Sequence, residues 1–248
     1  MGLKSKAVAL GTMAGIMSRF LTHRREMMNF HQSHYLEFAF KNVSFPQLVE
    51  NQPLQKLVLN FAPDTYGDVS WQELVTISAL VAHFKPLRIF EIGTFMGKTT
   101  YHLAANSPEQ AQVFTLDLPQ DNFGETIAQN PYDMNLLHEG KRHEVGFYFK
   151  NTAYQSKITQ LFSDSRSFDE TPYAQSMDMI FVDADHTYPS VINDTRKALR
   201  MLKTGESGKV ILWHDLRQRS DVERGILELC GRDKIRHIKD TMLGIYVS

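Results

Sequence analysis

The sequence has almost no cysteine and almost no charge imbalance. Cys230 is the single cysteine among 248 residues, which excludes an internal disulfide and a zinc cluster built from cysteines. Lys and Arg number 27 against 28 Asp and Glu, so the net charge is -1. Nucleic-acid binding requires surplus positive charge to meet the phosphates. The composition therefore predicts a globular, cytoplasmic protein that does not bind nucleic acid.

Long hydrophobic runs are also missing near the N-terminus. The apolar stretch at residues 7–17 is interrupted by Gly11 and Gly15 and ends before Arg19. A membrane-spanning helix needs about 20 apolar residues, and no small-residue cleavage pattern follows this stretch as it would in a signal peptide. We therefore expect no membrane span. We expect instead a helix that packs on the domain or on a partner subunit, as in a homo-oligomer.

What the chain does contain is a regular alternation of short apolar runs with helical patterns. Seven runs have the length and composition of strands, at 87–92, 112–116, 157–162, 177–182, 209–213, 234–239 and 243–247. Helical segments separate most of the first five, which indicates βαβ units and a parallel sheet. Only a turn joins the last two, which is typical of a hairpin. The prediction is an α/β fold: a Rossmann-like, doubly wound, seven-stranded, mostly parallel sheet with a C-terminal antiparallel hairpin at its edge.

Two segments fall outside this alternation. Residues 1–63 are predicted to form an N-terminal helical extension, and residues 64–248 the main domain. Within that domain, residues 119–156 are far longer than an ordinary strand-to-helix connection. Insertions of this kind at the carboxyl edge of a sheet often form a lid or a substrate wall. Its aromatic side chains, including Tyr148 and Phe149, are candidates for such a wall.

The most informative motif is EIGTFMGKTT at residues 91–100, which follows an apolar run and opens a helical pattern. A phosphate-binding P-loop needs four residues between its glycines, and Gly93 and Gly97 have three. The dinucleotide fingerprint also fails, because Thr94-Phe95 stands where its second glycine belongs. The pattern that fits is E-x-G-x-x-x-G followed by an acidic residue that closes the next strand. Asp117 is that residue, and a carboxylate there can accept both hydroxyls of a ribose.

Three later motifs extend this pattern in order: LFSDS at 161–165, DMIFVDADHTY at 178–188 and KVILWHD at 209–215. Together the motifs resemble the class I S-adenosylmethionine (SAM)-dependent methyltransferases. Within that class the chain is similar to the catechol and caffeoyl-CoA O-methyltransferases and their bacterial small-molecule relatives, over about residues 64–248. The resemblance implies methyl transfer from SAM to a hydroxyl of a small-molecule acceptor, with a divalent cation such as Mg²⁺ or Mn²⁺ as a candidate second cofactor.

The resemblance also implies a role for each matching residue. Cofactor contacts are expected from Tyr66, Glu91, Gly93, Gly97, Thr99, Asp117, Asp164, Ser165 and Asp183. Metal ligands are expected at Asp183, His214 and Asp215.

Two histidines depart from the family pattern. His214 stands where the family has an Asp ligand, and an imidazole nitrogen suits Mn, Fe or Zn better than Mg. His186 stands where the family has a Lys base. Imidazole titrates near neutral pH, so either histidine is a candidate catalytic base, with or without a metal. Asp185 is a candidate for bracing the loop only. Two other functions stay open: a P-loop-like NTPase, and a catalytically silent SAM-binding subunit.

Overall fold

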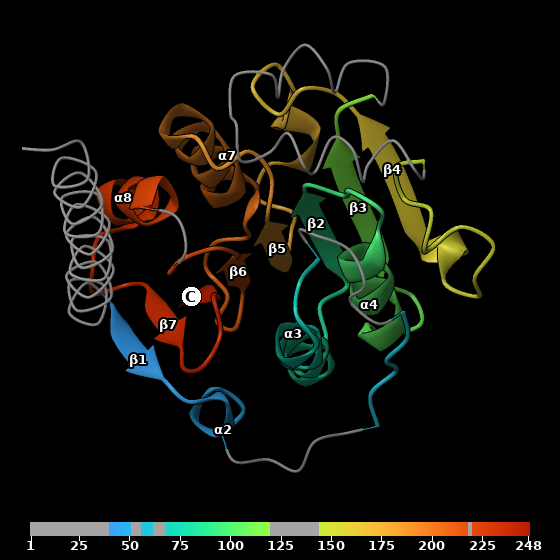
Figure 1. Ribbon diagram of the computed structural model, residues 1–248, viewed down its shortest axis with the longest axis horizontal. Helices are drawn as coiled ribbons and strands as arrows, with labels where there is room; N and C mark the ends of the chain where they lie inside the picture. The colour runs from blue at the N-terminus through green and yellow to red at the C-terminus, as the bar shows by residue number, and fades with distance from the viewer. Residues whose placement is uncertain (1–39, 51–55, 62–67, 120–143, 218–219) are drawn as a thin grey trace, which may run out of the picture. The chain divides into compact units, whose positions relative to one another are not determined.

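Eight strands form one sheet in the computed structural model, which describes residues 40–50, 56–61, 68–119, 144–217 and 220–248. The strands are β1 (Lys41–Val43), β2 (Arg88–Ile92), β3 (Gln112–Asp117), β4 (Ile158–Phe162), β5 (Met179–Val182), β6 (Val210–Trp213), β7 (Arg236–Ile238) and β8 (Gly244–Val247). Their order across the sheet is β1-β7-β8-β6-β5-β2-β3-β4 (Figure 1). The sequence-based prediction of a mostly parallel α/β sheet is confirmed.

Two details of the sheet differ from the prediction. β8 is antiparallel to both of its neighbours, β6 and β7, so the predicted hairpin is present. It does not form the edge of the sheet, however, because β1 pairs in parallel with β7. β1 is the eighth strand, and only Val43 of its three residues is buried. A strand this short, with one buried side chain, has no alternating pattern that would identify it.

The helices lie in two layers. They are α2 (Phe45–Leu48), α3 (Trp71–Phe84), α4 (Lys98–Asn106), α7 (Tyr188–Met201) and α8 (Ser220–Cys230), with short 3₁₀ turns at Gln155–Lys157 and Thr171–Tyr173. α3 packs beside α4, and α7 packs beside α8. Figure 1 shows these two pairs on opposite faces of the sheet. This is the doubly wound arrangement that the alternation predicts.

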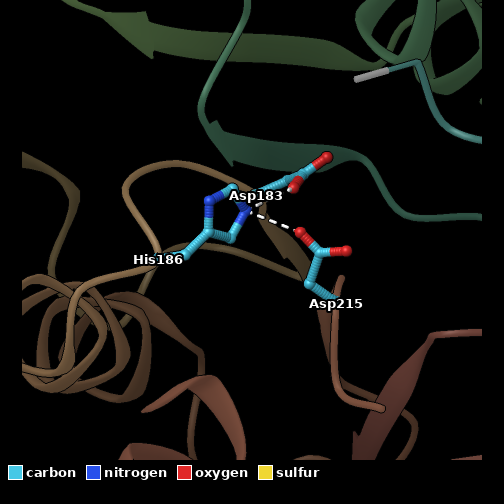
Figure 2. A group of neighbouring side chains, drawn as sticks. All are labelled: Asp183, His186 and Asp215. Atoms are coloured by element: carbon cyan, nitrogen blue, oxygen red, sulfur yellow. Dashed lines mark ion pairs between the residues drawn. The ribbon is translucent and has the colours of Figure 1, made fainter. Parts of the chain in front are cut away.

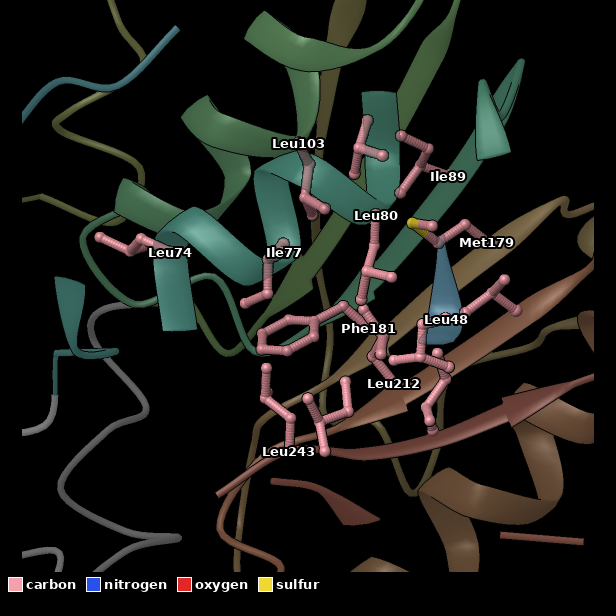
Figure 3. Packing of buried hydrophobic residues seen from close by; sticks show 14 of the residues in the cluster. Leu48, Leu74, Ile77, Leu80, Ile89, Leu103, Met179, Phe181, Leu212 and Leu243 are labelled. Atoms are coloured by element: carbon pink, nitrogen blue, oxygen red, sulfur yellow. The ribbon is translucent and has the colours of Figure 1, made fainter. Parts of the chain in front are cut away.

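The main core lies between the sheet and the pair α3 and α4 (Figure 3). Leu74, Ile77 and Leu80 recur at helical spacing on α3 and are fully buried. They face strand residues such as Phe181 and Leu212, which are also fully buried. Every residue of β5 and β6 is buried, as expected for central strands covered on both faces.

The strand order reverses between β2 and β5, and this reversal positions the site. From β2 the chain proceeds to β3 and β4 on one side, whereas β5 and β6 lie on the other side. In open α/β sheets, ligands bind at the carboxyl ends of the strands where the order reverses. The motif at 91–100 follows β2 and the motif at 178–188 contains β5. Both expected site motifs therefore meet at this point.

Parts of three predictions lie outside the described residues. These are most of the helical extension at 1–63, the first part of the insertion at 119–156, and Tyr66. The boundary between extension and main domain therefore stays a prediction. Within the described part of the chain, no helix is both long enough and apolar enough to cross a membrane.

Candidate functional site

The turn between β2 and α4 is shaped by two glycines with positive φ, Gly93 at 102° and Gly97 at 82°. The N–H of Gly97 donates to the carbonyl of Thr94 at 2.8 Å and closes the turn. A Cβ at Gly93 would lie 1.9 Å from the carbonyl oxygen of Asp183. No side chain fits there, because real Cβ atoms do not approach backbone so closely. The glycine turn thus lies directly against the residue that follows β5.

Asp117, at the end of β3, holds the glycine turn in place. Its Oδ2 accepts the N–H groups of Thr94 at 2.9 Å and Phe95 at 2.6 Å. Its Oδ1 accepts the N–H of Leu118 at 2.7 Å. Burial raises the pKa of Asp117, and the three backbone donors offset part of that rise. A carboxylate has about four acceptor positions, so this one braces the turn and keeps one position for a ligand.

Glu91 lies in β2 beneath the glycine turn and has no exposed surface. Its Oε2 accepts hydrogen bonds from the hydroxyls of Thr115, at 2.5 Å, and of Thr100. Its Oε1 is buried and accepts no hydrogen bond among the described residues. Burial raises the pKa of Glu91 to about 8. The turn therefore lies over a carboxyl group that has an unused acceptor.

The second half of the site is a group of three side chains, Asp183, His186 and Asp215 (Figure 2). Asp183 directly follows the buried strand β5, and Asp215 comes two residues after β6. Nε2 of His186 lies 2.7 Å from Oδ2 of Asp215 and 3.9 Å from Oδ1 of Asp183. One possible ligand atom from each residue lies within 4.8 Å of the other two. Two carboxylates and an imidazole form a donor set that suits a divalent transition metal.

His214 lies beside this group and faces three carboxylates, those of Asp183, Asp215 and Glu73. Its Nδ1 is 3.3 Å from Oδ1 of Asp183 and 3.6 Å from Oδ1 of Asp215, and its Nε2 is 3.4 Å from Oε2 of Glu73. Burial lowers the pKa of His214, but the neighbouring carboxylates of Asp183, Glu73 and Asp215 raise it well above its usual value. Among the described residues, the possible metal ligands that lie close together are Asp183, His186 and Asp215, and His214 contacts both aspartates from beside them.

The charge on Asp183 follows from these contacts. Burial would raise the pKa of Asp183, but His214 and His186 together lower it well below its usual range. Asp183 is therefore a carboxylate at neutral pH, as a cation ligand must be.

Glu73 was not expected from the sequence. It lies in the first turn of α3 and is 2% exposed. Its carboxylate accepts the Ser70 hydroxyl at 2.7 Å and the Met242 N–H at 2.7 Å. Burial raises its pKa, and His214 with these hydrogen bonds brings the net value down to about 2. The Ser70-x-x-Glu73 spacing is a signal for a helix capping box, which is also present, but it does not reveal the contact with His214.

The remaining predicted cofactor residues that the structure describes lie along the carboxyl edge of the sheet. Thr99 lies in the first turn of α4. Asp164 follows β4 and pairs with Arg166 at 2.6 Å, and this guanidinium lowers the pKa of Asp164. The side chain of Ser165 hydrogen-bonds Asp194 on α7. Tyr66 lies outside the described residues.

Asp185 has a bracing role. Its carboxylate accepts the N–H of Thr187 at 3.0 Å and the hydroxyl of Ser190 at 2.7 Å. Both partners lie at the start of α7. Asp185 therefore fixes the loop between β5 and α7, which carries His186.

The described end of the insertion covers the glycine turn. The N–H groups of Gly146 and Tyr148 donate to the carbonyls of Phe95, at 3.0 Å, and Met96, at 2.9 Å. A Cβ at Gly97 would lie 2.7 Å from the ring of Phe149, which is 3% exposed. Phe149 therefore packs on the turn itself.

Lys98 of the same motif is buried and paired. Its ammonium group lies 2.7 Å from Oδ2 of Asp68, and both side chains are almost fully buried. The ammonium also lies over the ring of Tyr148, 4.6 Å from its centroid. Lys98 thus joins α4 to the segment that precedes α3, in contrast to the phosphate-binding lysine of a P-loop.

Comparison with known families identifies the class of this chain. Residues 90–216 match a family model described as a methyltransferase domain. The match covers slightly more than half of the chain, and the chain belongs to this family. The matched region contains the glycine turn, Asp117 and the group of Asp183, His186 and Asp215. The predicted methyltransferase class is confirmed, and the NTPase alternative finds no support. No curated protein matches the sequence.

Solved structures are similar to this chain at low sequence identity. The methyltransferase PaMTH1 from Podospora anserina, bound to S-adenosylhomocysteine (SAH), is 14% identical. The similarity covers 90% of this chain and 95% of PaMTH1, with a TM-score of 0.50. The O-methyltransferase TomG from Streptomyces achromogenes, in complex with SAM, is 20% identical over 73% of this chain and 82% of its own, with a TM-score of 0.48. An O-methyltransferase from Bacillus cereus, in complex with SAH, is 14% identical over 82% and 90%, with a TM-score of 0.48.

Proposed function

We propose that this protein transfers the methyl group of SAM to a hydroxyl oxygen of a small molecule. The observation that carries the proposal is the contact between Gly93 and Asp183. Because of this contact, a glycine turn of the methyltransferase pattern and an acidic group suited to binding an acceptor lie side by side. The methyl donor and the oxygen that attacks it need this proximity, since the reaction depends mainly on holding the two in line.

The residues around the glycine turn fit SAM. The buried Oε1 of Glu91 has an unused acceptor position that the positively charged methionine part of SAM can satisfy. We assign the methionine carboxylate of SAM to Thr99, at the N-terminus of α4, where the helix dipole favours a negative charge. The remaining acceptor position of Asp117 is available to a ribose hydroxyl. We assign the adenine to Asp164 and Ser165, and a further cofactor contact to Tyr66. The SAH bound in PaMTH1 supports this choice of cofactor.

We assign a divalent cation to Asp183, His186 and Asp215, in place of the set with His214 that the resemblance implies. The set of two carboxylates and one imidazole nitrogen favours Mn²⁺ over Mg²⁺. When bound, such a cation lowers the pKa of an acceptor hydroxyl and orients it. The negative charge of Asp183 and the loop bracing by Asp185 prepare the site for it.

His186 has an alternative role as a general base, which it cannot perform while it binds a cation. Nε2 of His186 lies against the Asp215 carboxylate, so we assign the acceptor's proton to its Nδ1. The hydroxyl oxygen then attacks the methyl carbon, the bond from carbon to sulfur breaks, and neutral SAH leaves. This route makes His186 a general base in an enzyme that needs no cation. His214, with both ring nitrogens directed at carboxylates, is less suited to this task.

Three measurements test the proposal. Titration calorimetry with SAH and with ATP should show tight binding of SAH and none of ATP. Turnover of isotopically labelled SAM against a panel of phenols, sugars and polyketides should label an oxygen of at least one acceptor. Binding of SAH without transfer to any acceptor would instead support a catalytically silent SAM-binding subunit. Loss of turnover in EDTA, restored by Mn²⁺, separates the cation from the base role of His186.

We also propose that the protein is soluble and cytoplasmic and that it assembles as a homo-oligomer. The absence of surplus charge and the single cysteine support a cytoplasmic location. Light scattering of the purified chain tests the assembly.

A further inference from the structure

We propose that Glu73 is a positioning residue that acts through His214: it fixes the imidazole ring so that the ring holds the Asp183 carboxylate in place for the cation. The inference rests on the proposed cation site at Asp183, His186 and Asp215. It extends the site to α3, which lies outside the region that matches the methyltransferase family.

Glu73 is itself held from two directions. Its Oε2 accepts the backbone N–H of Ser70 at 3.1 Å and the hydroxyl of Ser70 at 2.7 Å. Its Oε1 accepts the N–H of Met242, before β8, at 2.7 Å. These donors come from the start of α3 and from the C-terminal hairpin, and the side chain is 2% exposed. A carboxylate with this many donors cannot rotate without losing several hydrogen bonds, so Glu73 is a rigid partner.

The ring of His214 lies between this rigid partner and the cation site. Its backbone N–H donates to the carbonyl of Val182 at 3.1 Å, which continues the pairing of β5 with β6. Nε2 lies 3.4 Å from Oε2 of Glu73, and on the opposite side of the ring Nδ1 lies 3.3 Å from Oδ1 of Asp183. Carboxylates on both sides of the ring together determine which way it faces. Glu73 thereby keeps Nδ1 of His214 directed at Asp183.

A side chain that contacts a metal-binding carboxylate affects which oxygen is presented to the metal. Such outer partners are worth about 10-fold to 100-fold in metal affinity or activity when they are removed. Removal of Glu73 also releases the ring of His214 to turn, so that Asp183 loses a neighbour held in one orientation. A purely structural role for Glu73, as a helix cap, would change stability and leave the cation site as it is.

The test measures Mn²⁺ binding to the full chain by electron paramagnetic resonance, beside thermal unfolding and methyl transfer. Glu73→Gln keeps the size of the side chain and an acceptor for Met242. We expect it to weaken Mn²⁺ binding about 10-fold or more, to lower kcat, and to leave the KM for SAM within about 2-fold. Asp178→Asn is the matched control, since Asp178 is a buried carboxylate at the opposite end of β5. It should lose stability with Mn²⁺ affinity unchanged.

A double-mutant cycle shows whether Glu73 acts through His214. If it does, His214→Gln and the double variant Glu73→Gln/His214→Gln bind Mn²⁺ equally weakly, because the second change removes nothing more. Ser70→Ala, which removes one donor to Glu73, is a milder variant that should shift Mn²⁺ affinity in the same direction if Glu73→Gln does not fold.

Two results would overturn the inference. Unchanged Mn²⁺ affinity in a folded Glu73→Gln protein would leave Glu73 as a helix cap only. Methyl transfer by a wild-type protein that binds no Mn²⁺ would also overturn it, while the proposed transfer from SAM would stand. Failure of the wild type to bind SAH or transfer a methyl group would contradict the proposed function itself.

Discussion

Gly93 and Asp183 are 90 residues apart in the sequence but touch through their backbones, so closely that a Cβ at Gly93 would lie 1.9 Å from the Asp183 carbonyl oxygen. The contact joins the end of β2 to the end of β5, where the strand order of the sheet reverses. It places the expected cofactor turn and the acidic group at one point.

Gly93→Ala should disrupt both halves of the site. The added methyl group cannot fit against the Asp183 carbonyl, and the φ of 102° is unfavourable for any residue with a Cβ. We expect loss of SAH binding by calorimetry and a destabilisation of more than about 2 kcal/mol. Gly205→Ala is the matched control, because Gly205 has a φ of 80° and a Cβ added there would meet no atom within 4 Å. It should cost about 1–2 kcal/mol and leave SAH binding intact; equal loss of SAH binding in both variants would refute the contact's role.

His186→Ala should separate cofactor binding from chemistry. The imidazole contacts Asp215 and lies close to Asp183, whereas the glycine turn is formed by other residues. We expect SAH affinity within about 2-fold of wild type and methyl transfer lowered at least about 100-fold, the usual range for loss of a general base or metal ligand. The measurement is calorimetry with SAH beside turnover of labelled SAM. Wild-type turnover in this variant would contradict both proposed roles of His186.

Glu91 should make the protein less stable as pH rises. Burial raises its pKa to about 8, from an ordinary value of 4.5. Between these values the folded protein holds a proton that the unfolded chain has lost, so the free energy of unfolding falls as pH increases. Glu91→Gln removes this dependence. The stability of the variant relative to wild type should therefore be higher at pH 8 than at pH 5, by about a few kcal/mol. Urea unfolding at both values measures the difference; the same pH slope in wild type and variant would contradict a buried neutral Glu91.

Asp178 should have the opposite pH dependence. Burial raises its pKa, but Lys203, Lys209 and the N–H groups of Leu87 and Arg88 bring the net value down to about 2, from 3.8. Its stabilising effect is therefore complete above pH 3.8 and is lost as pH falls through 2. Asp178→Asn should cost about 2 kcal/mol at pH 7, and the cost should shrink in unfolding experiments near pH 2. A cost independent of pH would show that the charge of Asp178 is not responsible.

The sequence was sufficient to predict most of the sheet. Central strands such as β5 and β6 are continuous apolar runs that end in acidic motifs, and the positions of their ends determine the site. β1 could not be predicted, because it is held by its pairing with β7 and has little pattern of its own.

Contacts within the site were harder to predict than its residues. Glu73 and His214 are separated by 141 residues, and Ser70-x-x-Glu73 is already explained by helix capping. Likewise, the position of Asp117 after a strand indicates a ribose ligand but does not show that its carboxylate also braces the glycine turn. Such contacts depend on side-chain direction after folding, which periodicity and spacing do not encode.

The most direct test of the central claim is methyl transfer from labelled SAM to a hydroxyl acceptor, measured with EDTA and then with added Mn²⁺. We predict labelled product from the wild type, loss of at least about 90% of the rate in EDTA, and recovery with Mn²⁺. Labelled product that is unaffected by EDTA would contradict the cation at Asp183, His186 and Asp215. No labelled product from any acceptor under either condition, despite SAH binding, would contradict the proposed enzyme.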